Sequence, residues 1–65
     1  MQKYKEKRTL SRPDIADRLR RIADEVERGS VVAGEMQLSM PDQAEFELEA
    51  ERDELEIKIE WSRTR

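Results

Sequence analysis

The chain has 65 residues, 45% of them charged and 35% apolar, so it is expected to form one small domain, residues 1–65, with a thin core. Cysteine and histidine are absent, which removes disulfides, thiolate metal sites and the usual general base of catalysis near neutral pH. No apolar run approaches the ~20 residues of a membrane span, and no signal peptide precedes the first predicted helix, so a soluble cytoplasmic protein is expected.

The net charge of −3 conceals an uneven distribution along the chain. Residues 1–28 contain nine Lys and Arg against six acidic residues, a balance of +3. Residues 29–65 contain four Lys and Arg against ten acidic residues, a balance of −6. The division predicts a basic side and an acidic side. Two copies could meet through these sides, or the basic side could face an anionic partner.

Residues 4–10 are highly charged and fit either a frayed tail or an edge strand. An amphipathic helix is predicted over about residues 12–28. Ser11 can accept hydrogen bonds from the free amides of the first turn, and Pro13 is tolerated there because its missing N–H has no intrahelical acceptor. Gly29 is the expected C-terminal stop. The apolar residues recur at spacings of four, three and four and fall on one stripe: Ile15, Leu19, Ile22 and Val26.

Three amphipathic strands are predicted after the helix. Residues 30–34 form a connector that leads into the first strand, residues 36–40, in which Met and Leu alternate with polar residues. Residues 44–50 and 55–61 alternate strictly between apolar and charged side chains. A period of two is typical of a strand with one buried and one solvated face.

Loop parity predicts the register of these strands. A three-residue loop, Pro41-Asp42-Gln43, gives the apolar pairs Met40–Ala44, Leu38–Phe46 and Met36–Leu48. A two-residue loop, Arg52-Asp53, gives the pairs Ala50–Leu55, Leu48–Ile57, Phe46–Ile59 and Ala44–Trp61. A slip of one residue at either loop would turn the apolar set toward water. The pattern therefore predicts a three-stranded antiparallel meander covered on one face by the helix.

The outer face of this meander is acidic. Glu47 is placed opposite Lys58, whereas the pairs Glu45–Glu60 and Glu49–Glu56 juxtapose like charges. Such pairs destabilise a ladder by roughly a few tenths of a kcal/mol in water. Two interpretations are open: a solvated face whose acids serve solubility, and a docking face for a basic partner or for the protein's own basic half.

The order of these segments resembles the amphi-Trp domain family of small archaeal and bacterial proteins. The resemblance spans about residues 4–61 and rests on three pieces: the helix sequence IADRLRRIAD from Ile15 followed by Gly29, the strand ending in Met40-Pro41, and the strand LEIKIEW that ends in Trp61. It implies an α+β fold of order β-α-β-β-β, with one helix on an antiparallel sheet of three to four strands. By this resemblance residues 4–10 are expected to form an edge strand. The family has no established biochemical function, so no activity is implied.

The residues favour a binding module over an enzyme. Catalysis by carboxylates needs a pocket that raises one pKa, and the glutamates here alternate outward on strands. No Asp-rich loop has the spacing of a Ca²⁺ site, and neither a metal, a cofactor nor a small-molecule substrate is expected. A thin core and exposed strand edges favour pairing with a second sheet. The leading expectation is a protein-interaction module that forms a homodimer.

Weak nucleic-acid binding through the basic N-terminal strand and helix is the alternative. Its candidate residues are Arg18, Arg21 and Arg28, with lysines of the N-terminal segment beside them. Acidic residues precede Arg18, Arg21 and Arg28 by four positions, the favourable order for intrahelical ion pairs, so the helix charge is largely self-compensated.

Trp61 is the remaining candidate interaction residue. The alternation places it on the inner face, where it would close the core opposite Ala44. The other interpretation leaves it partly exposed as an interface anchor, a role for which Trp is well suited.

Overall fold

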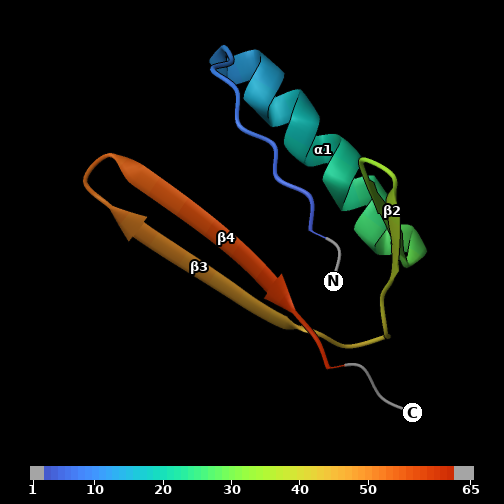
Figure 1. Cartoon of the computed structure of the whole chain (residues 1–65). Helices are drawn as coiled ribbons and strands as arrows, with labels where there is room; N and C mark the ends of the chain where they lie inside the picture. Colours follow the sequence, from blue (N-terminus) through green and yellow to red (C-terminus); the bar gives the residue numbers. More distant parts are fainter. Residues whose placement is uncertain (1–2, 63–65) are drawn as a thin grey trace.

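The computed structural model describes residues 3–62, which form one helix followed by four strands (Figure 1). In chain order the elements are α1 (Arg12–Arg28), β1 (Ser30–Ala33), β2 (Met36–Ser39), β3 (Glu45–Glu51) and β4 (Glu54–Glu60). The predicted α+β class and the bounds of the predicted helix are confirmed.

Both ends of α1 are capped as the sequence predicts. Ser11 is extended, with φ −67° and ψ 161°, and its Oγ accepts a hydrogen bond from the amide of Asp14 at 3.3 Å. At the other end Gly29 has a left-handed φ of 84°, and its amide donates to the carbonyl oxygen of Val26 at 3.0 Å. These bonds satisfy backbone groups that have no partner inside the helix.

The strands form two separate antiparallel ribbons, β1–β2 and β3–β4, and not a single meander. Residues 30–34, predicted as a connector, supply β1 and the start of a tight turn. Val31 lies opposite Leu38, and Ala33 lies opposite Met36. Gly34, with φ 63°, is the first residue of the two-residue turn, the position at which a type II′ hairpin turn requires glycine. β2 therefore pairs with β1 in a local hairpin. The predicted pairing of β2 with β3, and its register, are wrong.

The second ribbon, hereafter the β3–β4 hairpin, has the register predicted from its two-residue loop. Phe46 lies opposite Ile59, and the ladder continues to Glu51 opposite Glu54 across Arg52-Asp53. The ladder ends at Glu45 and Glu60, so Ala44 and Trp61 lie just beyond it and do not form the predicted strand pair.

The helix packs on β1 and not on a broad sheet. The cross-strand residues of one ribbon face are half-buried: Val31, Ala33, Met36 and Leu38. Ile22 and Val26, in the C-terminal half of α1, are half-buried as well. A hydrogen bond also connects α1 to β1: the amide of Val32 donates to Glu25 Oε1 at 3.0 Å.

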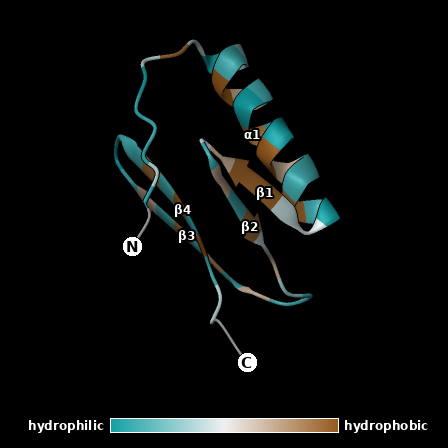
Figure 2. Ribbon diagram, turned by 45° about the vertical axis from the view of Figure 1, so that its right-hand side comes forward, coloured by the Kyte–Doolittle hydropathy of each residue, from teal (hydrophilic) through white to brown (hydrophobic). Residues whose placement is uncertain are grey.

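The β3–β4 hairpin lies apart from this unit (Figures 1 and 2). Within residues 3–62 its backbone makes no close approach to α1, β1 or β2, and no side chain is fully buried. The predicted cover of the hairpin by the helix is therefore wrong in the single chain, and the apolar face of the hairpin is open.

Residues 3–10 form no strand, which corrects the predicted N-terminal edge strand. The segment runs beside α1 (Figure 1) and is held there by side chains. Tyr4 lies over Gly34: a Cβ atom built on that glycine would be 2.5 Å from Tyr4 Cδ1. Glu6 accepts hydrogen bonds from Arg18 of α1. Side-chain contacts thus replace the backbone ladder that an edge strand would have made.

Replacing Gly34 by Ala should destabilise the protein for two reasons. The left-handed backbone is unfavourable for alanine by about 1–3 kcal/mol, and the new methyl group collides with Tyr4. In a Tyr4→Ala background only the backbone cost remains, so Gly34→Ala should destabilise that background less. Denaturant unfolding of the four proteins in this double-mutant cycle measures the difference. Equal losses in both backgrounds would contradict the Tyr4–Gly34 contact.

Candidate interaction surface

Half of the exposed large apolar residues that the structure describes lie on one face of the β3–β4 hairpin. Every second side chain of both strands points to this face, and these side chains lie opposite one another across the ladder. We call the following set the apolar hairpin face: Phe46, Leu48, Ala50, Leu55, Ile57 and Ile59. Phe46 and Leu55 are each 65% exposed. Monomeric proteins rarely expose a contiguous apolar patch of this kind without a partner for it.

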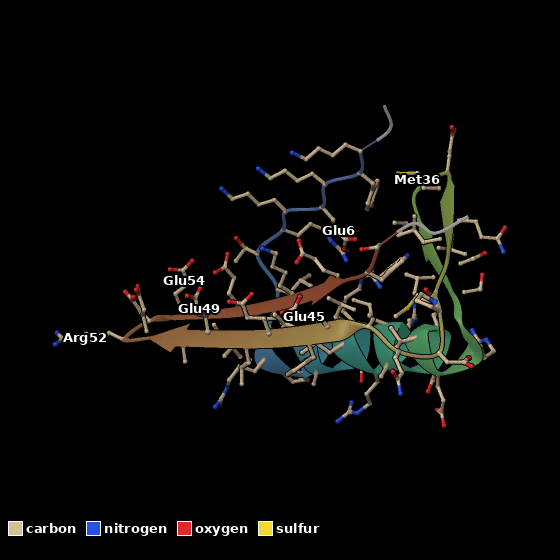
Figure 3. The ribbon with its side chains drawn as sticks, turned by 90° about the horizontal axis from the view of Figure 1, so that it is seen from below. Glu6, Met36, Glu45, Glu49, Arg52 and Glu54 are labelled. Atoms are coloured by element: carbon tan, nitrogen blue, oxygen red, sulfur yellow. The ribbon has the colours of Figure 1, made fainter. Side chains whose placement is uncertain are left out.

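The opposite face of the hairpin is acidic. Figure 3 shows Glu45, Glu49 and Glu54 on one side of the hairpin and Arg52 at its tip. The Cα partners Glu49 and Glu56 lie side by side, and the hydrogen bond and negative charge of Glu49 raise the pKa of Glu56. The acidic face predicted from sequence is therefore formed, including the unfavourable Glu49–Glu56 pair.

A second apolar surface is uncovered on the N-terminal half of α1. Ile15 is 45% exposed and Leu19 is 43% exposed, whereas Ile22 and Val26 further along the same stripe are half-buried against the β1–β2 ribbon. We call Ile15 and Leu19 the open helix stripe. The helix thus meets its ribbon over only part of its length.

The overall dimensions of the chain agree with these open surfaces. Its accessible surface is 6670 Å², whereas a compact monomer of 7.7 kDa exposes about 4,300 Å². The excess is about 2,300 Å². The radius of gyration is 13.1 Å, against about 11 Å for a compact domain of this length. One chain alone therefore leaves a large area that folding usually buries.

A charged cluster holds the N-terminal segment on α1. Arg18 donates twice to Glu6, from Nη2 to Oε1 at 2.9 Å and from Nε to Oε2 at 3.2 Å, and Arg8 also donates to Oε2. The hydrogen bonds from Arg18 and then Arg8 lower the pKa of Glu6 to about 2. Glu6 was missed in the sequence analysis. Its signal was its place as the lone acidic residue among the bases of residues 1–10.

The four candidate residues do not form one site. Arg18 and Arg21 line one open groove together with Tyr4, Glu6 and Arg8. Arg28 ends α1, about 15 Å along the helix axis from Arg18. Trp61 is half-buried directly after β4. Neither Arg28 nor Trp61 lines the Arg18 groove.

In residues 3–62 no three acidic side chains converge closely enough to hold a metal ion. The only helix of this part of the chain, α1, is too short and too polar to cross a membrane.

The family model of the Amphi-Trp domain matches residues 1–65, the whole chain. The chain belongs to the Amphi-Trp domain family. No match was found among the curated proteins or among the solved structures. The match confirms the resemblance seen in the sequence. The family is a domain of unknown function, so membership of the Amphi-Trp family does not assign an activity.

The clamp between Glu6 and Arg18 should make the Amphi-Trp domain sensitive to acid. In the folded state the pKa of Glu6 falls from 4.5 to about 2. The clamp therefore stabilises the fold fully above pH 4.5, and its contribution is lost as the pH falls through about 2. Hydrogen exchange or denaturant unfolding from pH 5 to about 2 measures this loss.

The matched variant for this experiment is Glu6→Gln, which keeps the shape of the side chain and removes its titration. It should be less stable than the native chain at neutral pH, and its stability should change less between pH 4.5 and about 2. Glu56→Gln controls for the opposite trend, because the raised pKa of Glu56 favours the fold at low pH and that benefit is lost as the pH rises. Identical pH profiles for Glu6→Gln and the native chain would contradict the clamp.

Proposed function

We propose that this Amphi-Trp domain is a non-enzymatic protein-interaction module that acts in the cytoplasm as a homodimer. One observation carries the proposal: the apolar hairpin face is largely exposed, from 45% at Ile57 to 65% at Phe46 and Leu55, and within residues 3–62 the hairpin backbone makes no close approach to α1 or to the β1–β2 ribbon. Burial of apolar surface is the main driving force of association, and here the surface is already arranged on a regular two-stranded scaffold.

The excess surface of the chain has the size of a stable dimer interface. Stable homodimers bury about 2,000–5,000 Å² in total, or roughly 1,000–2,500 Å² from each partner. The chain exposes about 2,300 Å² more than a compact monomer of its mass. One symmetric interface between two copies would therefore bring each chain close to the surface of an ordinary folded protein.

The charged grooves support binding better than catalysis. The groove on the acidic face is lined by Glu47, Glu49, Glu56 and Lys58. All four side chains are exposed, so water screens their charges, and a strongly perturbed carboxyl of the kind used in acid–base catalysis needs more burial. The same exposure suits a solvated outer face of a dimer.

Replacing Leu48 by Asp should abolish the dimer because it places a charge at the centre of the apolar hairpin face. The native chain should sediment at twice 7.7 kDa, and Leu48→Asp at that mass once. Sedimentation velocity over a wide concentration range measures both. Glu47→Gln is the matched control, because it lies next in sequence on the opposite face and should leave the dimer unchanged.

Circular dichroism should show that Leu48→Asp keeps its secondary structure, since Leu48 is already exposed in the single chain. A native chain that stays monomeric at high concentration would overturn the homodimer proposal.

Nucleic-acid binding is a second candidate, and the Arg18 groove favours it. Tyr4, Arg8, Arg18 and Arg21 line this groove, and a base can stack on an aromatic ring while arginines contact the backbone phosphates. Glu6 lies in the same groove and already accepts hydrogen bonds from Arg8 and Arg18. We rank this function second because a phosphate would have to displace that carboxylate.

If the groove binds single strands, Glu6→Gln should strengthen binding of single-stranded DNA or RNA at low salt, because it removes the competing negative charge. Fluorescence anisotropy with labelled oligonucleotides at increasing salt measures the change. Arg21→Gln should weaken the binding of both backgrounds. No binding by either protein at low salt would exclude this candidate.

A further inference from the structure

The homodimer proposed above leaves open which surface of the second copy covers the apolar hairpin face. We propose that the two copies exchange their hairpins: the apolar hairpin face of each copy packs on the open helix stripe of the other. The inference rests on the proposed homodimer and specifies its interface.

The first support is that one chain contains two open apolar surfaces. Four residues of the apolar hairpin face are exposed, as is the open helix stripe, and the hairpin backbone makes no close approach to α1 within residues 3–62; the four are Phe46, Leu48, Leu55 and Ile57. A dimer in which two hairpins stack face to face would leave Ile15 and Leu19 in water. Reciprocal exchange covers both surfaces with one twofold-symmetric interface, which closes after two copies.

The second support is the match in length. Four-residue strands span about 13 Å, so the β1–β2 ribbon covers about half of a 17-residue helix, which is about 25 Å long. The strands of the β3–β4 hairpin have seven residues each and span about 24 Å. The hairpin is therefore about as long as the whole of α1, and it can span the N-terminal half that the β1–β2 ribbon leaves uncovered.

The third support is the connection between the two parts of the chain. The amide of Met40 donates to the carbonyl oxygen of Gly29 at 2.9 Å, so the chain is fixed to the end of α1 up to that point. The hairpin begins at Glu45, after the short segment 41–44 that includes Pro41. The sequence pattern predicts that the hairpin packs on a helix through its apolar face. A hinge that holds it away from its own helix presents that face to the helix of a second copy, as in domain swapping.

The fourth support is electrostatic. Residues 45–60 contain eight acidic and two basic residues, a balance of −6. Residues 3–8, which lie beside α1 through the Glu6–Arg18 pair, contain four basic residues and one acidic residue, a balance of +3. Exchange places the acidic hairpin of one copy near the basic segment of the other. Stacked hairpins would keep their acidic faces outward but would place two elements of net charge −6 next to each other, which is unfavourable.

Mixing two charged variants tests the exchange. Leu19→Asp disrupts the open helix stripe, and Leu48→Asp disrupts the apolar hairpin face. With exchange, each variant alone should be monomeric, because both symmetric contacts contain the substitution. An equimolar mixture should form heterodimers, since the native hairpin of one variant meets the native helix of the other. Sedimentation velocity should show dimer only in the mixture, with weaker affinity than the native chain.

Arg20→Gln is the matched control on the helix. It changes the net charge by one negative unit, as Leu19→Asp does, at the neighbouring exposed position, and it should remain dimeric. If Leu19→Asp alone dimerises like the native chain, exchange is wrong and the homodimer proposal stands. If the native chain is monomeric, both proposals fail.

Cysteine cross-linking covers the case in which an aspartate variant does not fold. The native chain has no cysteine, so Leu19→Cys and Leu48→Cys each introduce a single thiol. With exchange, oxidation of the mixture should give mainly the mixed disulfide dimer, seen on a non-reducing gel. Predominant Leu48→Cys homodimers would show stacked hairpins and overturn the exchange. A Leu19→Cys/Leu48→Cys double variant that oxidises within one chain when dilute and concentrated alike would overturn it as well.

Discussion

The shortness of β1 and β2 is the constraint on which the rest of the structure depends. Because each strand has four residues, the ribbon buries the C-terminal half of the apolar stripe of α1 and leaves Ile15 and Leu19 open. Six further apolar residues, from Phe46 to Ile59, are on a hairpin whose backbone makes no close approach to the helix within residues 3–62. The sequence therefore contains enough apolar residues for a core, but a single chain distributes them over surfaces that do not meet.

Side-chain contacts, and not a buried core, hold the N-terminal segment in place. Arg18 fixes Glu6, and the ring of Tyr4 occupies the space above Gly34, so the N-terminal segment is attached to both the helix and the β1–β2 turn. Exposed ion pairs are weaker than apolar burial, and salt screens them. Such contacts position a segment but do not replace a buried interior, which is why association is central to the proposed function.

Local signals in the sequence predicted α1, β2 and the β3–β4 hairpin, but they missed β1, predicted an N-terminal strand that does not form, and gave the wrong partner for β2. The Ser11 and Gly29 caps and the four-three-four spacing were sufficient for α1, and the even loop at Arg52-Asp53 was sufficient for the β3–β4 register. The alternation of Met36 and Leu38 predicts a strand, but it does not say whether that strand pairs with residues 30–33 before it or with residues 45–51 after it. Gly34 decided in favour of β1, because its positive φ allows a tight turn. The Glu6–Arg18 contact spans twelve positions, a separation at which no periodic pattern operates.

The alternating glutamates of the hairpin have a consequence for a chain whose apolar hairpin face is uncovered. A two-stranded ribbon with two open edges and one apolar face is the kind of template on which fibrils grow by stacking identical strands. In such a stack each glutamate would lie beside its own copy at about 4.8 Å. The repulsion along seven glutamate columns opposes fibril growth while the carboxylates are ionised. The acidic face of the hairpin is thus expected to oppose aggregation while the apolar hairpin face remains uncovered.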